Sequence, residues 1–191
     1  ETLLLANNVL LLVACGAVLL GTLYPLALDA MNLGKISVGP PYFETVFVPL
    51  LAPLVFLMGV GPIARWKETA LPDLATRLRW AAGCAVVATL VVALARGGLG
   101  IVAVAGLLMA FWIVAAVATD LTERLRPAGG VRASVLHRAR QIPRAMVGMM
   151  LAHLGVAVFI FGVTLVRTGE VERDVQMGPG DTTTIGDLVF T

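Results

Sequence analysis

One histidine, His153, lies within Met146–Val166, an otherwise uncharged apolar stretch that is long enough to cross a lipid bilayer. Placing an ionisable side chain inside the bilayer costs free energy and is therefore rare, so a functional role is the first hypothesis for such a residue. Neutral imidazole is a good iron ligand, and a membrane helix can present one to a haem. A proton relay and a plain hydrogen bond to a neighbouring helix are the alternatives. The residue alone leaves all three open.

Small residues surround His153 in the chain. Gly148, Ala152 and Gly155 share one helical face by the i, i+4, i+7 rule, and His153, one position from Ala152, is expected to border that face. Small side chains allow close approach of another helix backbone, and they would equally allow a flat macrocycle to lie against the helix. Helix packing and macrocycle binding both remain possible on this pattern.

The only other histidine, His137, lies in a basic amphipathic stretch, residues 133–143. This pattern is typical of a segment at the membrane surface, so His137 is expected outside the bilayer and not as a ligand. A haem held by two histidines would then take its second ligand from outside this chain. The two cysteines, Cys15 and Cys84, are far apart in apolar runs and are expected to be buried packing residues.

Motifs of several enzyme classes are absent from the sequence. It contains no CxxC pair, Walker-type loop, GxSxG, HExxH or paired catalytic carboxylates, and no catalytic residue can be assigned. Carboxylates are also missing from the centres of the apolar runs, which argues against a proton-coupled transporter.

Composition places the chain in a membrane. Of its 191 residues, 59% are hydrophobic and only 14% are charged, whereas soluble domains carry about 25% charged residues. Membrane lipid is therefore an expected partner, and nucleic acid is not. Runs of about 20 apolar residues predict five spans. They are Leu3–Leu28, Val46–Ile63, Trp80–Leu94, Ile101–Ala118 and Ala145–Val166.

Charge distribution sets the expected orientation. The loops Ala64–Arg79 and Thr119–Arg144 lie on the same side of a five-span protein and hold ten of its fourteen basic residues. The positive-inside rule places both loops in the cytoplasm, with Trp66 and Trp80 in an interfacial aromatic belt. Residues 29–44 and the segment after Arg167 then face the outside. Trp112 lies deeper, and packing and cofactor contact stay open for it.

The C-terminal segment changes character. Residues 170–177, 182–185 and 188–190 read as strands separated by turns at Gly178–Asp181 and Gly186–Asp187. Because one hairpin is only marginally stable alone, we expect further β structure beyond Thr191. Since the sequence begins at Glu1, we also expect that the native N-terminus precedes it. The predicted fold is an all-α polytopic membrane protein with about five transmembrane helices and the start of a small external β domain. Residues 1–167 form the helical bundle and residues 168–191 begin the β-rich domain.

Several stretches of the sequence form recognisable motifs in a fixed order. They are Leu3–Leu12, Gly21–Pro25, Gly34–Phe43, Gly59–Trp66, Gly148–Gly155 and Val171–Asp181. Two strings within them, GKISVGPPYF and ERDVxMxPGD, are specific. In this order and spacing the stretches resemble the CcmF family, the haem lyase subunit of the bacterial system that matures c-type cytochromes, and the resemblance covers nearly the whole chain.

The resemblance implies an enzyme component, a haem lyase or holocytochrome c synthetase that helps to attach haem to the CxxCH thiols of apocytochrome c. It implies a membrane-embedded b-type haem with His153, in the AHLG motif, as one axial ligand of the iron. The implied partners are a haem chaperone and apocytochrome c with its presenting and thiol-reducing subunits. The implied location is the bacterial inner membrane, with the C-terminal tail in the periplasm.

The family's tryptophan-rich motif, its flanking histidines and the second haem ligand are not in this sequence, so this portion alone is expected to be inactive. The alternatives are a haem exporter or transporter core, in which His153 relays substrate, and a structural membrane subunit, in which His153 only packs.

Overall fold

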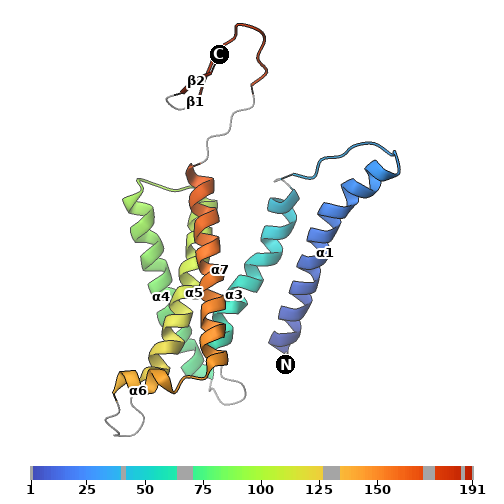
Figure 1. Cartoon of the computed structure of the whole chain (residues 1–191). Coiled ribbons are helices and arrows are strands. Elements are labelled where there is room, and N and C mark those ends of the chain that lie inside the picture. The colour runs from blue at the N-terminus through green and yellow to red at the C-terminus, as the bar shows by residue number, and fades with distance from the viewer. Residues whose placement is uncertain are drawn as a thin grey trace.

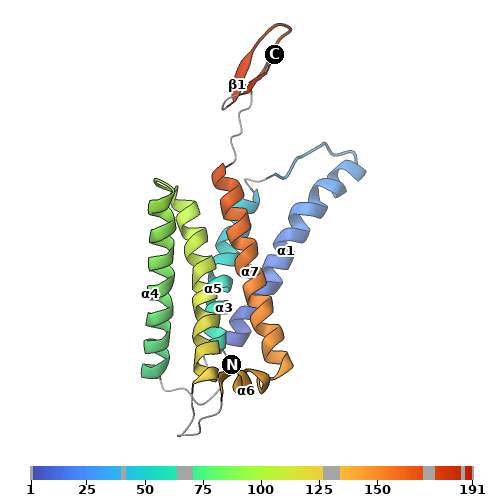
Figure 2. The same cartoon turned by 60° about the vertical axis from the view of Figure 1, so that its left-hand side comes forward.

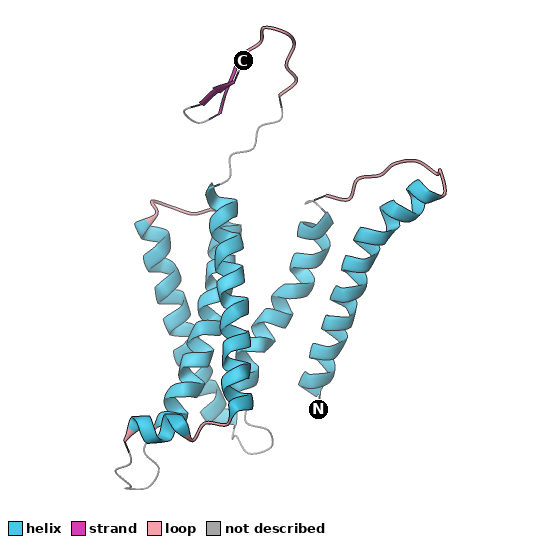
Figure 3. Cartoon of the chain, in the orientation of Figure 1, coloured by secondary structure: helices cyan, strands magenta, loops and turns pink. Residues whose placement is uncertain are grey.

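Five long helices form the protein in the computed structural model, which describes residues 2–39, 42–63, 71–126, 134–169, 175–185 and 188–190 (Figures 1 and 3). In the described residues five helical segments are long and apolar enough to cross a membrane, which confirms the predicted number of spans. The elements are α1 (Thr2–Ala30), η1 (Phe43–Phe47), α3 (Val48–Ile63), α4 (Leu71–Ala95), α5 (Ile101–Leu125), α6 (Val135–Arg140), α7 (Arg144–Gly169), β1 (Thr183–Ile185) and β2 (Leu188–Phe190).

Helix α5 is central and packs against α3, α4 and α7, whereas α1 packs mainly on α3 and the π-helical turn η1 (Figures 1 and 2). The bundle has two ends. We call the end with α6, where α4 begins and α5 terminates, the α6 end, and the opposite end, which the C-terminal hairpin follows, the tail end (Figure 1). Because the spans alternate in direction, the basic helix termini gather at the α6 end.

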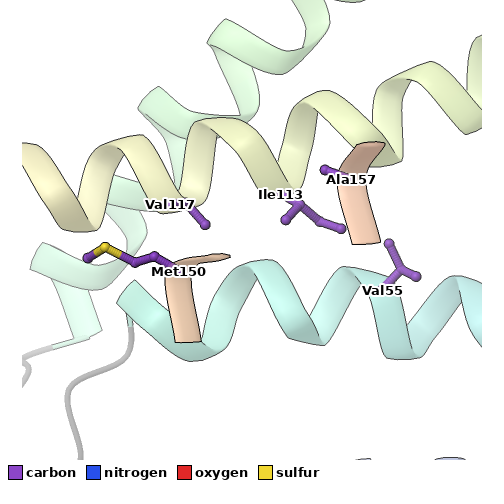
Figure 4. Packing of buried hydrophobic residues seen from close by; sticks show 5 residues of the cluster. All are labelled: Val55, Ile113, Val117, Met150 and Ala157. Carbon is purple, nitrogen blue, oxygen red and sulfur yellow. The ribbon is translucent and has the colours of Figure 1, made fainter. Parts of the chain in front are cut away.

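Two clusters of buried side chains join the helices. The first, cluster A, connects α3, α5 and α7, and consists of Val55, Ile113, Val117, Met150 and Ala157 (Figure 4). The second, cluster B, connects α3, α4 and α5, and consists of Ile63, Ala81, Ala85, Trp112 and Ala116. Lipid tails are as apolar as these side chains, so close packing is what holds such helices together. Ala81 and Ala85 of α4 provide that close approach.

Two helices extend further than the apolar runs predicted. Helix α4 begins at Leu71 instead of Trp80, and α5 continues to Leu125 instead of ending at Ala118. The extra turns contain charged residues that are paired, which allows them to stay helical at the membrane boundary. The pairs are Arg77 with Glu123, with Nη1 and Oε2 2.5 Å apart, and Arg124 with Asp120, with Nε and Oδ2 2.8 Å apart.

The hairpin predicted for the C-terminal segment is present. Strands β1 and β2 pair antiparallel, with Thr184 opposite Val189. The turn before β1 closes when the backbone N–H of Gly178 donates to the carboxylate of Asp181 over 2.7 Å. The strand expected over residues 170–177 is not seen at residues 175–177, which have no partner strand in the described chain. Residues 170–174 and the turn predicted at residues 186–187 lie outside the described residues.

Candidate functional site

His153 lies in the first half of α7, about 13 Å along the axis from Arg144 at the standard helical rise. It is partly buried within a segment that is long and apolar enough to span the membrane. Its Nδ1 atom lies 2.8 Å from the backbone carbonyl oxygen of Met149, one helical turn earlier. The imidazole is therefore hydrogen-bonded to the backbone of its own helix.

This contact fixes the tautomer of the ring. A carbonyl oxygen can only accept, so Nδ1 carries the proton and donates it. In neutral imidazole the other nitrogen, Nε2, then has a free lone pair. No hydrogen bond to Nε2 is found among the described residues. Nε2 is also not among the fully buried polar atoms that lack a hydrogen-bond partner. Histidines that bind metals usually donate their second ring nitrogen in this way. In this state His153 would be able to hold a haem iron through Nε2.

The small-residue face of α7 is separate from His153. Gly148, Ala152 and Gly155 are exposed, and a Cβ added at either glycine meets nothing within 4 Å. Consecutive helical residues point about 100° apart, and His153 lies instead beside the packed face of α7, one turn from the buried residues Met150 and Ala157. The expectation that His153 borders the small face is wrong for this reason. The described helices leave that face uncovered.

Methionines are concentrated around the packed side of α7. Five of the chain's seven methionines belong to cluster A or pack against it, so flexible side chains make up much of this packing surface. Thioether side chains are flexible and polarisable, and they adapt to irregular partners. The five are Met58, Met109, Met146, Met149 and Met150.

His137 lies on α6, away from His153 on α7. It is exposed on α6, and its Nε2 lies 3.0 Å from Nε2 of Gln141. Its backbone N–H is capped by the hydroxyl of Ser134. Helix α6 has 6 residues, far fewer than a membrane span needs, and the position of His137 outside the bilayer stays a prediction. Within the described chain no three His, Cys, Asp or Glu side chains gather into a metal-binding group.

Trp112, whose role the sequence left open, is a packing residue. It is 6% exposed, stacks on Phe56 with ring planes 7° apart, and donates its Nε1–H to the Phe56 carbonyl oxygen over 3.0 Å. Gly59 makes room for it, because a Cβ there would lie 2.2 Å from Nε1. Trp80 is 67% exposed on α4, and its place in an aromatic belt stays a prediction. Trp66 lies outside the described residues.

The loop between α1 and η1 is anchored to α1. The Tyr42 hydroxyl donates to the carbonyl oxygen of Ala17 over 2.9 Å, and its ring meets Phe43 edge to face. Gly21 lies under this ring, because a Cβ there would approach Tyr42 Cε1 to 2.6 Å. Two of the stretches noted in the sequence thus meet each other. These contacts make Tyr42 an anchor of the loop on α1, whereas Pro40 and Pro41 lie outside the described residues.

Sequence reasoning missed one contact at the tail end. Arg167 of α7 forms an ion pair with Glu44 of η1, and both side chains are about half exposed. The pair connects the helix that carries His153 to the start of α3. No local pattern signals it, since the two residues are far apart in the chain.

The chain is similar over its whole length to curated bacterial proteins. It is 41% identical over 196 residues to the cytochrome c-type biogenesis protein CcmF of Escherichia coli and 40% identical over 190 residues to CcmF of Pseudomonas aeruginosa. It is 36% identical over 187 residues to the cytochrome c-type biogenesis protein CycK of Rhizobium meliloti. The first two alignments cover 100% of this chain and the third covers 97%.

The alignments cover only part of these relatives, because the chain spans 28% of the length of each. No protein-family model and no solved structure matches the chain. A five-span bundle followed by a two-stranded hairpin, together with identities of this level across every span, leads to one conclusion. The chain belongs to the CcmF family of cytochrome c-type biogenesis proteins and corresponds to a portion of its members.

Proposed function

We propose that this chain is part of the membrane subunit of a cytochrome c haem lyase, and that His153 is an axial ligand of a b-type haem held within the bundle. The likeness to proteins named for cytochrome c biogenesis supports the process. The observation that carries the residue assignment is the state of the imidazole. Nδ1 is committed to Met149, and the lone pair of Nε2 has no partner among the described residues.

The residues of this chain prepare the ligand. The Met149 carbonyl keeps the proton on Nδ1 and limits rotation of the ring, so Nε2 is ready to bind without a change of tautomer. The apolar side chains around α7 exclude water, and exclusion of water tunes the potential of any bound iron. A haem ligated here would supply one-electron redox chemistry. The second axial ligand would come from a part of the protein outside this chain.

The proposed orientation follows from charge. The described basic side chains at the α6 end include seven arginines, which favours the cytoplasm for that end of an inner-membrane protein. They are Arg77, Arg79, Arg124, Arg126, Arg138, Arg140 and Arg144. The hairpin and the loop anchored by Tyr42 would then face the periplasm. There they would meet the haem chaperone and the apocytochrome c with its presenting and thiol-reducing subunits.

A maturation assay tests the proposal. Cells that lack the intact protein are complemented with wild type, His153→Gly or His137→Gly, and covalently bound haem in a c-type cytochrome is measured. We expect loss of holocytochrome with His153→Gly, partial recovery when imidazole is added, and no loss with His137→Gly. Recovery by imidazole distinguishes iron ligation from a purely structural role.

The alternatives predict other results in the same cells. A haem exporter would lose periplasmic haem in the His153→Gly strain even when no apocytochrome is expressed. A structural subunit would mature cytochrome normally with His153→Gly. Normal maturation by a stably expressed His153→Gly protein would overturn the assignment of His153.

A further inference from the structure

A polar cleft opens between α4 and α5 at the α6 end of the bundle. Its volume is about 510 Å³, large enough for a lipid headgroup. None of its lining residues belongs to the neighbourhood of His153. The lining residues are Thr76, Arg77, Trp80, Thr119, Thr122, Glu123 and Arg126.

The arginines give the cleft its donors. Arg126 is exposed and makes no ion pair with any described residue. Arg77 uses only Nη1, on Glu123, so its other N–H groups are not engaged by the described chain. A planar guanidinium suits the oxygens of a phosphate group. Two arginines against one glutamate leave the lining with a net charge of +1, which suits a monoanionic phosphodiester.

The threonines contribute acceptors. The hydroxyl of Thr119 donates to the carbonyl oxygen of Ala115, and that of Thr122 donates to the carbonyl oxygen of Thr119. Their protons are therefore committed, but their oxygens can still accept. The Glu123 carboxylate adds further acceptor capacity. This combination favours a phosphate whose substituent carries hydroxyl donors of its own.

The position of the cleft indicates a membrane-bound ligand. Trp80 lines the cleft and is 67% exposed, and in the proposed orientation it would lie in the aromatic belt at the level of the headgroups. On the same face of α4, at helical spacing from Trp80, the exposed residues Val87, Val91 and Leu94 continue into the apolar part of the span. An acyl chain can lie along this stripe while the phosphate stays in the cleft.

From these features we infer that the cleft binds an anionic phospholipid with a hydroxylated headgroup, for which phosphatidylglycerol is the probe. The chemistry shared with free phosphate esters is the contact of phosphate oxygens with Arg77 and Arg126. The hydroxyls of the headgroup donate to the threonine oxygens and to Glu123. The acyl chain along α4 is what a soluble phosphate ester cannot supply.

Native mass spectrometry of the intact protein in detergent, titrated with phosphatidylglycerol or phosphatidylcholine, tests the site. We expect selective binding of phosphatidylglycerol and about a tenfold loss of affinity in Arg126→Gln, since a hydrogen bond between charged groups contributes about that factor or more. The matched control is Arg79→Gln, which removes an equal charge from the same end of α4 but does not line the cleft. The inference predicts no loss there.

Two further experiments distinguish a lipid from a soluble phosphate ester and test whether the bound lipid lies beside Trp80. Glycerol 3-phosphate, the soluble arm, should not displace phosphatidylglycerol, and displacement at equal concentration would overturn a lipid site in favour of a soluble ligand. Brominated phosphatidylglycerol should quench wild-type tryptophan fluorescence more than that of Trp80→Phe, and brominated phosphatidylcholine should not show this difference. Equal losses in Arg126→Gln and Arg79→Gln, or equal quenching by both lipids, would refute the inference.

Discussion

Replacing Gly59 by alanine should destabilise the bundle, because Trp112 occupies the space that the new methyl group needs. The added Cβ would lie 2.2 Å from Nε1 of Trp112 and 2.8 Å from Cδ1 and Cε2. These distances fall well below van der Waals contact, and the obstacle is a buried, rigid ring. Trp112 must therefore shift away from Phe56.

The magnitude follows from what Trp112 would lose. Its hydrogen bond to the Phe56 carbonyl contributes about 1 kcal/mol and the stacking about 1 kcal/mol. Overpacking adds about 1–3 kcal/mol, while alanine regains about 1 kcal/mol of helix propensity over glycine. The expected loss in the free energy of unfolding is about 2–4 kcal/mol.

The assay is reversible unfolding in mixed detergent micelles, followed by circular dichroism. Gly61→Ala is the matched control: it lies in the same helix, is exposed, and would place its Cβ in open space. It should be neutral or stabilising by up to about 1 kcal/mol. In a Trp112→Ala background the penalty for Gly59→Ala should vanish, because the obstacle is gone. Equal stability of Gly59→Ala and Gly61→Ala would refute the reasoning.

Two further predictions concern contacts elsewhere in the bundle. Gly106→Ala should destabilise the contact of α5 with α7 by about 1–3 kcal/mol, since its Cβ would lie 2.3 Å from Oγ1 of Thr164, whereas Gly148→Ala should be tolerated in the same unfolding assay. A Gly106→Ala protein as stable as wild type would contradict this. Tyr42→Phe should cost about 1 kcal/mol by removing the hydrogen bond to Ala17, and faster hydrogen exchange at the start of η1 should report it. Unchanged exchange there would show that the hydroxyl does not anchor the loop.

The number and order of the spans could be predicted because runs of apolar residues reflect bilayer thickness directly. The helix ends could not. Arg77 and Glu123 look like loop residues in the sequence, yet they pair across α4 and α5 and remain helical. A Gly-Gly pair between two apolar runs indicates a turn, and Gly97 and Gly98 between α4 and α5 both adopt the positive φ angles that favour glycine. Burial within the spans was less predictable, since Cys15 and Cys84 were expected to be buried and are both exposed. Contacts between distant residues had no local signal.

The candidate site shows the same division. His153 stood out because an ionisable residue in an apolar span is rare. Its partner, Met149, is a backbone carbonyl and leaves no trace in residue types. The face on which His153 lies was mispredicted, because sequence adjacency to Ala152 is not adjacency on a helix. The packing role of Trp112 needed the position of Gly59, which lies in another helix.

The central claim is that His153 ligates haem, and a reduced-minus-oxidised optical spectrum of the purified intact protein tests it most directly. Wild type and His137→Ala should both show a b-type spectrum. In His153→Ala that spectrum should be lost, while the helical circular dichroism is retained. A b-type spectrum that persists in His153→Ala, or well-folded wild-type protein without haem, would contradict the account.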